Sequence, residues 1–154
     1  MVKHPTIASE TKFRVIRARE SSTVKEAIPL ISRGAFCIGV KEARGIEAAY
    51  WLLYRASMSD LGIFLGYEYG YPKTVAVAML PSNMFMEHPQ IAMVYNEGDP
   101  RLFVEVAARM RKWLQEEGYN CALAMRRRNP AAFRRATKHF GEPRDYGTML
   151  LYEF

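Results

Sequence analysis

Hydrophobic and polar positions follow the clearest regular pattern between residues 99 and 118. Five apolar residues recur there at the spacing of one helical face, namely Leu102, Val106, Met110, Trp113 and Leu114. The opposite face is charged and carries Arg101, Glu105, Arg109, Lys112 and Glu116. Asp99 followed by Pro100 is a typical helix start, and Gly118 is a typical end signal. The pattern predicts an amphipathic helix between Asp99 and Gly118.

Two further elements are predicted after this helix. Cys121 to Met125 is a short apolar run bounded by charge, which favours a buried strand. Asn129 followed by Pro130 repeats the start signal and predicts a second helix that ends near Gly141. Gln90 to Tyr95 predicts a strand before the first helix, so the order is strand, helix, strand, helix. That order favours a right-handed crossover and parallel strand pairing.

The beginning of the chain predicts an arm, a strand and a helix. Residues 1–12 have no periodicity and are expected to form a flexible N-terminal arm. Phe13 to Ala18 alternates between apolar and polar residues in the manner of a strand. Thr23-x-x-Glu26 matches a capping box, and the helix after it should be short or kinked because it contains Pro29.

A second helix and two strands are predicted in the middle of the chain. The helix lies within Lys41 to Ser57, and its expected inward residues are Ile46, Ala49, Tyr50 and Leu53. Ile63 to Tyr69 and Thr74 to Leu80 then predict two strands joined by a turn at Gly70 to Lys73. The stretch from Thr148 to Phe154 predicts a closing strand.

This order of elements resembles a known fold. Four segments carry the resemblance: the strand at Ile91 to Tyr95, the long helix ending in Glu-Glu-Gly-Tyr at 116–119, the buried strand, and the Asn-x-x-Ala-Phe sequence at 129–133. Together they are similar to the C-terminal half of the GNAT N-acetyltransferases. The first half of the chain follows the order of that fold in outline. The resemblance implies an α/β protein with a single GNAT-like domain over residues 13–154, in which helices flank a mixed central sheet.

The resemblance also implies an acyl-CoA-dependent N-acyltransferase that uses acetyl-CoA and an amine acceptor. The residues expected at its cofactor cleft are Tyr95, Asn96, Glu97, Gly98, Asp99, Arg101 and Asn129. Candidates for proton transfer are Glu68, Glu97 and Tyr146, with packing or surface roles as the alternative. The chain departs from the family in two places. Arg101 and Phe103 stand where its phosphate loop has small residues, and Ala136 stands where many members have a tyrosine.

A second hypothesis is a non-catalytic protein on the same scaffold. The chain is also similar to small GNAT-like proteins found among podovirus virion-assembly genes, which keep the Asn-x-x-apolar-apolar helix but lack the glycine loop and the tyrosine. Such a protein would act by binding, and it would be located in the host cytoplasm or the virion. Direct binding or modification of nucleic acid is a third hypothesis.

Positive charge is concentrated near the end of the chain. Residues 1–100 carry 11 Lys and Arg against 10 Asp and Glu, whereas residues 101–154 carry 11 against 6. Most of the excess belongs to a basic cluster formed by Arg126, Arg127, Arg128, Arg134, Arg135 and Lys138. The basic cluster predicts a site for nucleic acid, for the phosphates of coenzyme A or for an acidic protein, with an ordinary solvated surface as the alternative.

Composition favours one globular domain, since the 154 residues are 49% hydrophobic and 25% charged. No stretch approaches the roughly 20 apolar residues that cross a bilayer, and the N-terminus lacks a signal peptide's apolar core. We therefore expect a cytoplasmic protein without a membrane partner. Both a monomer and a homo-oligomer stay open from the sequence. Cys37 and Cys121 lie in apolar context and are expected to be buried free thiols. His4, His88 and His139 share no metal-ligand spacing, so no metal is expected.

Overall fold

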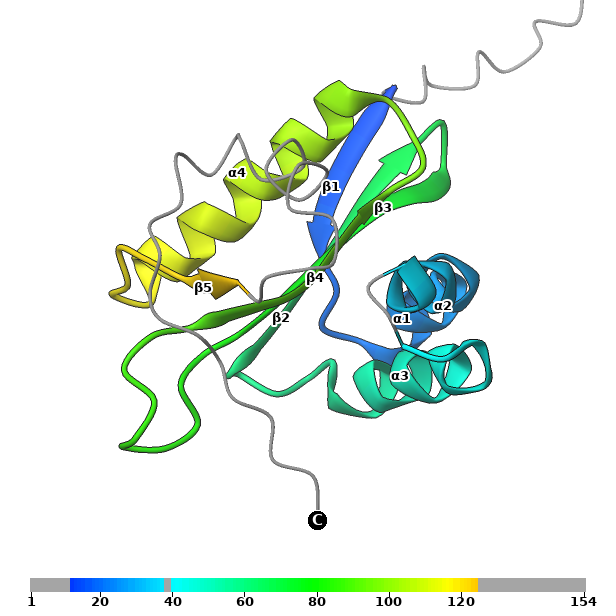
Figure 1. Cartoon of the computed structure of the whole chain (residues 1–154). Coiled ribbons are helices and arrows are strands. Elements are labelled where there is room, and N and C mark those ends of the chain that lie inside the picture. The colour runs from blue at the N-terminus through cyan, green and yellow to red at the C-terminus, as the bar shows by residue number, and fades with distance from the viewer. Residues whose placement is uncertain (1–11, 38–39, 125–154) are drawn as a thin grey trace, which may run out of the picture.

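A computed structural model describes residues 12–37 and 40–124, which form a five-stranded sheet with helices on both faces (Figure 1). The strands are β1 (Phe13–Arg17), β2 (Leu61–Glu68), β3 (Tyr71–Met79), β4 (Gln90–Asn96) and β5 (Leu123–Ala124). The helices are α1 (Ser21–Glu26), α2 (Ile28–Cys37), α3 (Glu42–Arg55) and α4 (Pro100–Glu116). The strands lie in chain order; the first four pair antiparallel, and β5 pairs parallel to β4. The predicted α/β class with a mixed sheet is confirmed. The helix predicted from Asn129 and the strand predicted at 148–154 lie outside the described residues, as does most of the predicted arm.

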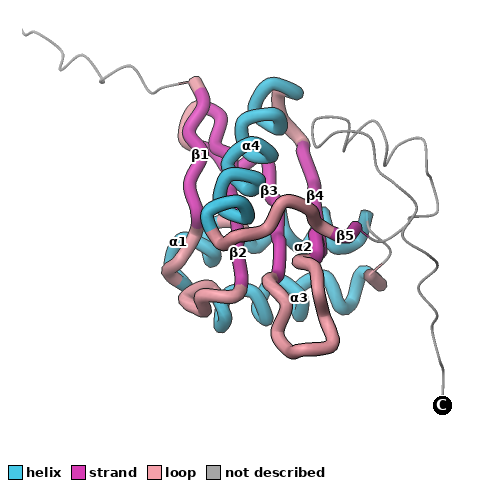
Figure 2. Tube along the Cα trace, turned by 90° about the vertical axis from the view of Figure 1, so that its left-hand side faces the viewer, coloured by secondary structure: helices cyan, strands magenta, loops and turns pink. Residues whose placement is uncertain are grey.

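The sheet separates two hydrophobic cores. Helices α1, α2 and α3 cover one face and α4 crosses the other (Figures 1 and 2). Ile63 and Val75 belong to the core under α1–α3, whereas Phe64 and Ala76 belong to the core under α4. Neighbouring residues of β2 and β3 thus enter opposite cores, as the two-residue period of a strand requires. Both central strands are therefore apolar along most of their length.

The structure of α4 confirms the predicted amphipathic helix. The Asp99 carboxylate accepts a hydrogen bond from Arg101 N at 2.9 Å, and Gly118 follows the helix with φ of 92°. The predicted apolar face is buried against the sheet. A Cβ atom at Gly62 of β2 would lie 2.6 Å from the Trp113 ring, so the absence of a side chain there allows the close contact between α4 and the sheet.

The predicted capping box at Thr23 is wrong. The N-cap of α1 is Glu20, three residues earlier, and no side chain caps the helix. The predicted interruption by proline is confirmed, because the helical segment divides at Ala27. Pro29 is the second residue of α2. Backbone N–H groups in the first turn of a helix have no acceptor within the helix, so proline costs no helical hydrogen bond there.

Helix α3 confirms the predicted segment but turns a different face inward. Ile46 and Tyr50 are 55% and 45% exposed, so their expected burial is wrong. A Cβ atom at Gly45 would lie 2.9 Å from the Ser32 carbonyl oxygen of α2. The inward stripe therefore consists mainly of small side chains, and the larger ones are directed outward. Its residues are Gly45, Ala49, Leu52 and Ala56.

The turn between β2 and β3 is shorter than predicted. Tyr69 and Gly70 have φ of 49° and 83°, and Glu68 pairs with Tyr71 across them. Two successive positive φ values are typical of a two-residue hairpin turn. The predicted four-residue turn is therefore wrong, since Pro72 and the residues beside it belong to β3.

The apolar run after α4 is less buried than predicted. Strand β5 contains two residues, of which Leu123 is half-buried and Ala124 is exposed. The expectation of buried thiols is also wrong, because Cys37 and Cys121 are both free and exposed. Cys121 Sγ lies 3.2 Å from His88 Nδ1, near the point where β5 meets β4.

Candidate functional site

The candidate site begins at a bulge in β4, next to the residues that pair with β5. In the pairing of β3 with β4, Ala78 faces Ile91 and Val77 faces Met93, so Ala92 is an additional, bulged residue. Among the residues that the structure describes, Gln90 and Ile91 of β4 pair with Leu123 and Ala124 of β5. A β-bulge redirects the strand and its polar groups, and such bulges are frequent beside functional sites. In the described part of the chain, no strand lies next to β4 on this edge from Met93 to Asn96.

A polar cluster links the end of β4 to α2. Arg33 donates to the Glu97 carboxylate through Nε and also through Nη2, the latter at 2.9 Å. Tyr95 Oη donates to the same carboxylate at 2.9 Å. The Arg33 hydrogen bond holds the pKa of Glu97 below its usual value, so this carboxylate is ionised near neutral pH. Burial, followed by the bond to Glu97, raises the pKa of Tyr95 to about 12, so the phenol stays protonated.

A cavity of about 350 Å³ adjoins this cluster. Its lining combines the Arg33 guanidinium with the Cys37 thiol and the aromatic rings of Phe36 and Tyr95. Sequence reasoning missed Arg33, because α2 and β4 are distant in the chain and nothing local indicates their contact.

The loop between β4 and α4 is closed by its own hydrogen bonds. Every backbone N–H from Glu97 to Leu102 donates to an acceptor within the protein, apart from Pro100, which has none. The pairs are Glu97 N with Lys73 O (2.8 Å), Gly98 N with Asn96 Oδ1 (3.0 Å), Asp99 N with Glu68 Oε2 (3.1 Å), Arg101 N with Asp99 Oδ1 (2.9 Å) and Leu102 N with Asp99 O (3.0 Å). An incoming pyrophosphate would therefore have to replace existing acceptors, including a carboxylate.

The predicted loop residues lie close together and hold one another in place. The hydrogen bond from the Arg101 side chain keeps the pKa of Asp99 well below its usual range, and Lys12 contacts the same carboxylate at 3.4 Å. A Cβ atom at Gly98 would lie 2.7 Å from Glu68 Oε2. Asn96 Oδ1 also accepts from Thr74 Oγ1 at 2.6 Å. Glu68 and Asn96 thus position the loop.

Several predicted site residues lie outside the part of the chain that the structure describes. They are Asn129, Tyr146 and the whole basic cluster. Among the described residues, no group of three potential metal ligands occurs, and no helix is long and apolar enough to cross a membrane.

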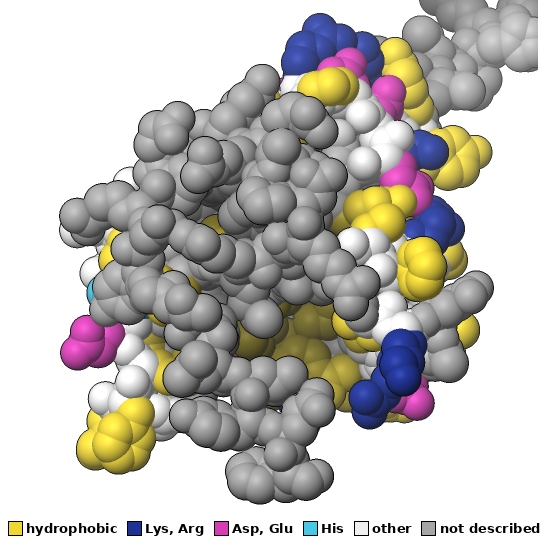
Figure 3. Space-filling view, in the orientation of Figure 1, with side chains coloured by type: hydrophobic (Ala, Val, Ile, Leu, Met, Phe, Trp, Pro, Cys, Tyr) yellow, Lys and Arg dark blue, Asp and Glu magenta, His cyan; other side chains and the backbone are white. Residues whose placement is uncertain are grey.

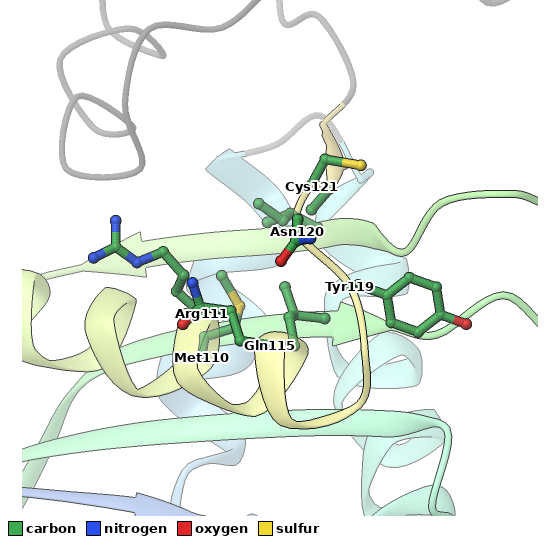
Figure 4. Close-up of a pocket in the computed structure, with 9 residues that line it drawn as sticks. Met110, Arg111, Gln115, Tyr119, Asn120 and Cys121 are labelled. Atoms are coloured by element: carbon green, nitrogen blue, oxygen red, sulfur yellow. The ribbon is translucent and has the colours of Figure 1, made fainter.

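A further cavity, of about 130 Å³, lies between the second half of α4 and the segment that leads into β5. Figure 4 shows that Arg111 and Tyr119 extend in opposite directions from it, while the Asn120 amide lies above the helix.

Comparison with solved structures identifies the architecture. A predicted acetyltransferase from Clostridium acetobutylicum, solved with acetyl-CoA, has 12% identity and a TM-score of 0.68, covering 91% of this chain and 96% of its own. The fold is that of the GNAT acetyltransferases. A ribosomal-protein-alanine N-acetyltransferase from Brucella melitensis has 11% identity and a TM-score of 0.67, with coverages of 92% and 99%. A GCN5-related N-acetyltransferase from Ralstonia eutropha has 14% identity and a TM-score of 0.63, with coverages of 91% and 98%.

At these identities the likeness to GNAT structures establishes the fold alone. No protein-family model matches the sequence, and no curated protein matches it either. Activity therefore has to be argued from the residues at the end of β4.

Proposed function

We propose that the protein is an acyl-CoA-dependent N-acyltransferase whose cofactor binds along the edge of β4 from Met93 to Asn96. The observation that carries this proposal is the bulge at Ala92, which redirects β4 directly after the residues that pair with β5. Backbone groups on such an edge can pair with an extended partner that contains amides, as the pantetheine arm of coenzyme A does. The similar Clostridium acetobutylicum protein was solved with acetyl-CoA, which supports this choice of ligand.

The acceptor amine would lie at the C-terminal end of β4. Its nitrogen attacks the thioester carbonyl, the new C–N bond forms, and the C–S bond then breaks to release the thiolate. The ionised Glu97 carboxylate is suited to hold a cationic amine and to accept its proton through water. We assign this role to Glu97 because its carboxylate contacts Arg33 and Tyr95, two residues that line the cavity at the end of β4.

Calorimetry with acetyl-CoA tests the binding step directly. We expect saturable binding and a higher melting temperature, because a ligand of the native state stabilises it in proportion to RT ln(1 + [L]/Kd). Glu97→Gln should retain acetyl-CoA binding while it slows transfer to an amine by about 10²-fold or more. Absence of both binding and thermal stabilisation at millimolar acetyl-CoA would remove the enzyme hypothesis.

A second candidate is a non-catalytic binding protein on the GNAT scaffold, with virion assembly as its context. The observation that favours it is the closed loop before α4, in which the Asp99 carboxylate occupies the position of an external anion. Exposed apolar side chains of the loop between β3 and β4 offer a contact surface, since Met84 and Phe85 are 88% and 89% exposed. Hydrophobic side chains are visible at the lower left of the space-filling view (Figure 3).

The basic cluster would be the second contact surface of such a protein. Replacing Arg126, Arg128 and Arg134 by glutamine should then weaken binding to an acidic protein or a nucleic acid in a salt-dependent manner. Equal binding by the wild type and the triple variant at two salt concentrations would identify the cluster as a solvated surface.

A further inference from the structure

A separate polar cavity lies on the flank of α4 that faces β1, away from β4 and β5. It has a volume of about 400 Å³ and is formed by the end of β1 and the second half of α4. Its lining includes Val15, Arg17, Arg19, Arg109, Trp113 and Glu116. Three guanidinium groups and one carboxylate therefore border the same space.

Two of the lining residues each contain a buried donor that forms no hydrogen bond. Trp113 is only 3% exposed, and its Nε1 forms no hydrogen bond. Arg17 Nε is also buried without a partner, although Arg17 Nη2 donates to Leu61 O at 3.1 Å. The Arg17 guanidinium stacks on the Trp113 ring, 4.7 Å from a ring centroid. Because native proteins leave few buried polar groups unpaired, these two donors indicate an acceptor that the protein itself does not supply.

The charges around the cavity also favour an anion. Burial lowers the pKa of Arg17, and repulsion from Arg19 and Arg109 acts in the same direction. Glu117 opposes this effect, and Glu116 lies at the cavity but also contacts Lys112 at 3.9 Å. The nearby carboxylates thus leave the three arginines incompletely neutralised.

We propose that this cavity is a binding site for a phosphate group, held by Arg17, Arg19 and Arg109 with the Trp113 indole N–H as a further donor. Guanidinium groups pair with both carboxylates and phosphates. A phosphate is favoured here because its tetrahedral oxygens can accept from donors on β1 and α4 at once, and because it can carry a second negative charge. The site is separate from the acyl-CoA edge of β4, so the two proposals can fail independently.

The two tryptophans of the chain provide the test. In a titration of the full-length protein with inorganic phosphate at constant ionic strength, the indole N–H resonance of Trp113 should shift and saturate. The Trp51 resonance should not move, since Trp51 lies on α3 and is 43% exposed. A Trp113 resonance that stays in place would overturn the proposal.

Charge variants separate a specific site from general attraction. Arg19→Gln and Arg109→Gln change exposed side chains, and each should weaken phosphate binding by about tenfold through loss of a charged hydrogen bond. Arg14→Gln is the matched control, because Arg14 also lies on β1 but stacks over Tyr67 on the other face of the sheet. Glu116→Gln should tighten binding by removing a negative charge from the lining. Equal weakening by Arg14→Gln and Arg109→Gln would contradict a local site.

Further titrations identify the ligand. Tighter binding of a nucleoside 5′-monophosphate than of inorganic phosphate would identify a phosphate ester, whereas preference for inorganic phosphate would identify the free ion. If acetate shifts the Trp113 resonance and binds with the same affinity as phosphate, the assignment to phosphate is overturned. Arg109→Gln should leave acetyl-CoA binding unchanged.

Discussion

Arg33 and Glu97 form a bidentate ion pair that joins α2 to the end of β4. The pair connects the helical layer on one face of the sheet with the strand edge proposed to bind acyl-CoA. Because Glu97 also accepts from Tyr95, its carboxylate contacts two residues that line the cavity beside α2. The pH dependence of the stability that this ion pair contributes and the catalytic contribution of Glu97 can both be measured.

The first prediction concerns the pH dependence of this ion pair. The folded-state pKa of Glu97 lies below its ordinary value of 4.5, so its contribution to stability is present above that value and is lost as the pH falls through the folded-state pKa. Arg33→Gln should therefore lower the melting temperature at pH 7 but not at pH 2. The effect should be below about 1 kcal/mol because the pair is partly exposed.

Arg44→Gln is the matched control for this experiment. Arg44 contacts Glu47 at 3.5 Å, and both side chains are more than two-thirds exposed. We expect no measurable change at either pH. An Arg33→Gln effect that persists unchanged at pH 2 would assign the stabilisation to packing instead of charge.

A second prediction uses the difference in burial between the two tryptophans. Trp113 packs between α4 and the sheet, with its ring centroid 5.6 Å from that of Phe64, so Trp113→Ala should cost about 3–5 kcal/mol in free energy of unfolding. Trp51→Ala should cost less than about 1 kcal/mol, since Trp51 is 43% exposed and stacks with Arg55. Urea denaturation measures both values. Similar losses in free energy of unfolding for the two variants would contradict the burial of Trp113 in the core under α4.

The third prediction concerns Gly98. A methyl group there would lie 2.7 Å from Glu68 Oε2 and 2.8 Å from Lys73 Cβ, so Gly98→Ala must displace the loop or β3. We expect a loss of about 1–3 kcal/mol in urea denaturation, as is usual for overpacking. A second substitution, Lys73→Gly, should recover part of the loss by removing one of the two contacts. No destabilisation in Gly98→Ala would show that the loop rearranges freely.

The fourth prediction concerns the thiols. Cys37 and Cys121 are the two cysteines of the chain, and both are exposed. Iodoacetamide should therefore alkylate both in the native protein without denaturant, as counted by mass spectrometry, with Cys37→Ser and Cys121→Ser identifying each site. A thiol that reacts only after unfolding would contradict its exposed position.

The sequence predicted best those features whose signals are local. Helix α4 was predicted from signals within a few turns, namely the cap at Asp99, the proline after it and the apolar face through Met110. The structure confirms this helix. The inward face of α3 was mispredicted because the decisive contact is between Gly45 and Ser32 of another helix. The ion pair of Arg33 with Glu97 spans 64 positions and has no local sequence signal. Only the neighbouring loop residues could be named in advance, through the resemblance to the GNAT fold.

The last prediction tests whether the start of α4 still attracts a pyrophosphate. The Asp99 carboxylate accepts from Arg101 N, and it places a negative charge where an anion would otherwise benefit from the helix dipole. Asp99→Ser retains a capping oxygen but removes that charge, so it should tighten acetyl-CoA binding several-fold while the melting temperature stays nearly unchanged. Calorimetry with acetyl-CoA and with acetyl-pantetheine, which lacks the nucleotide and the pyrophosphate, should show the gain only for acetyl-CoA. An equal gain for both ligands would mean that Asp99 acts on the pantetheine arm along β4, and no gain for either would place the pyrophosphate away from α4.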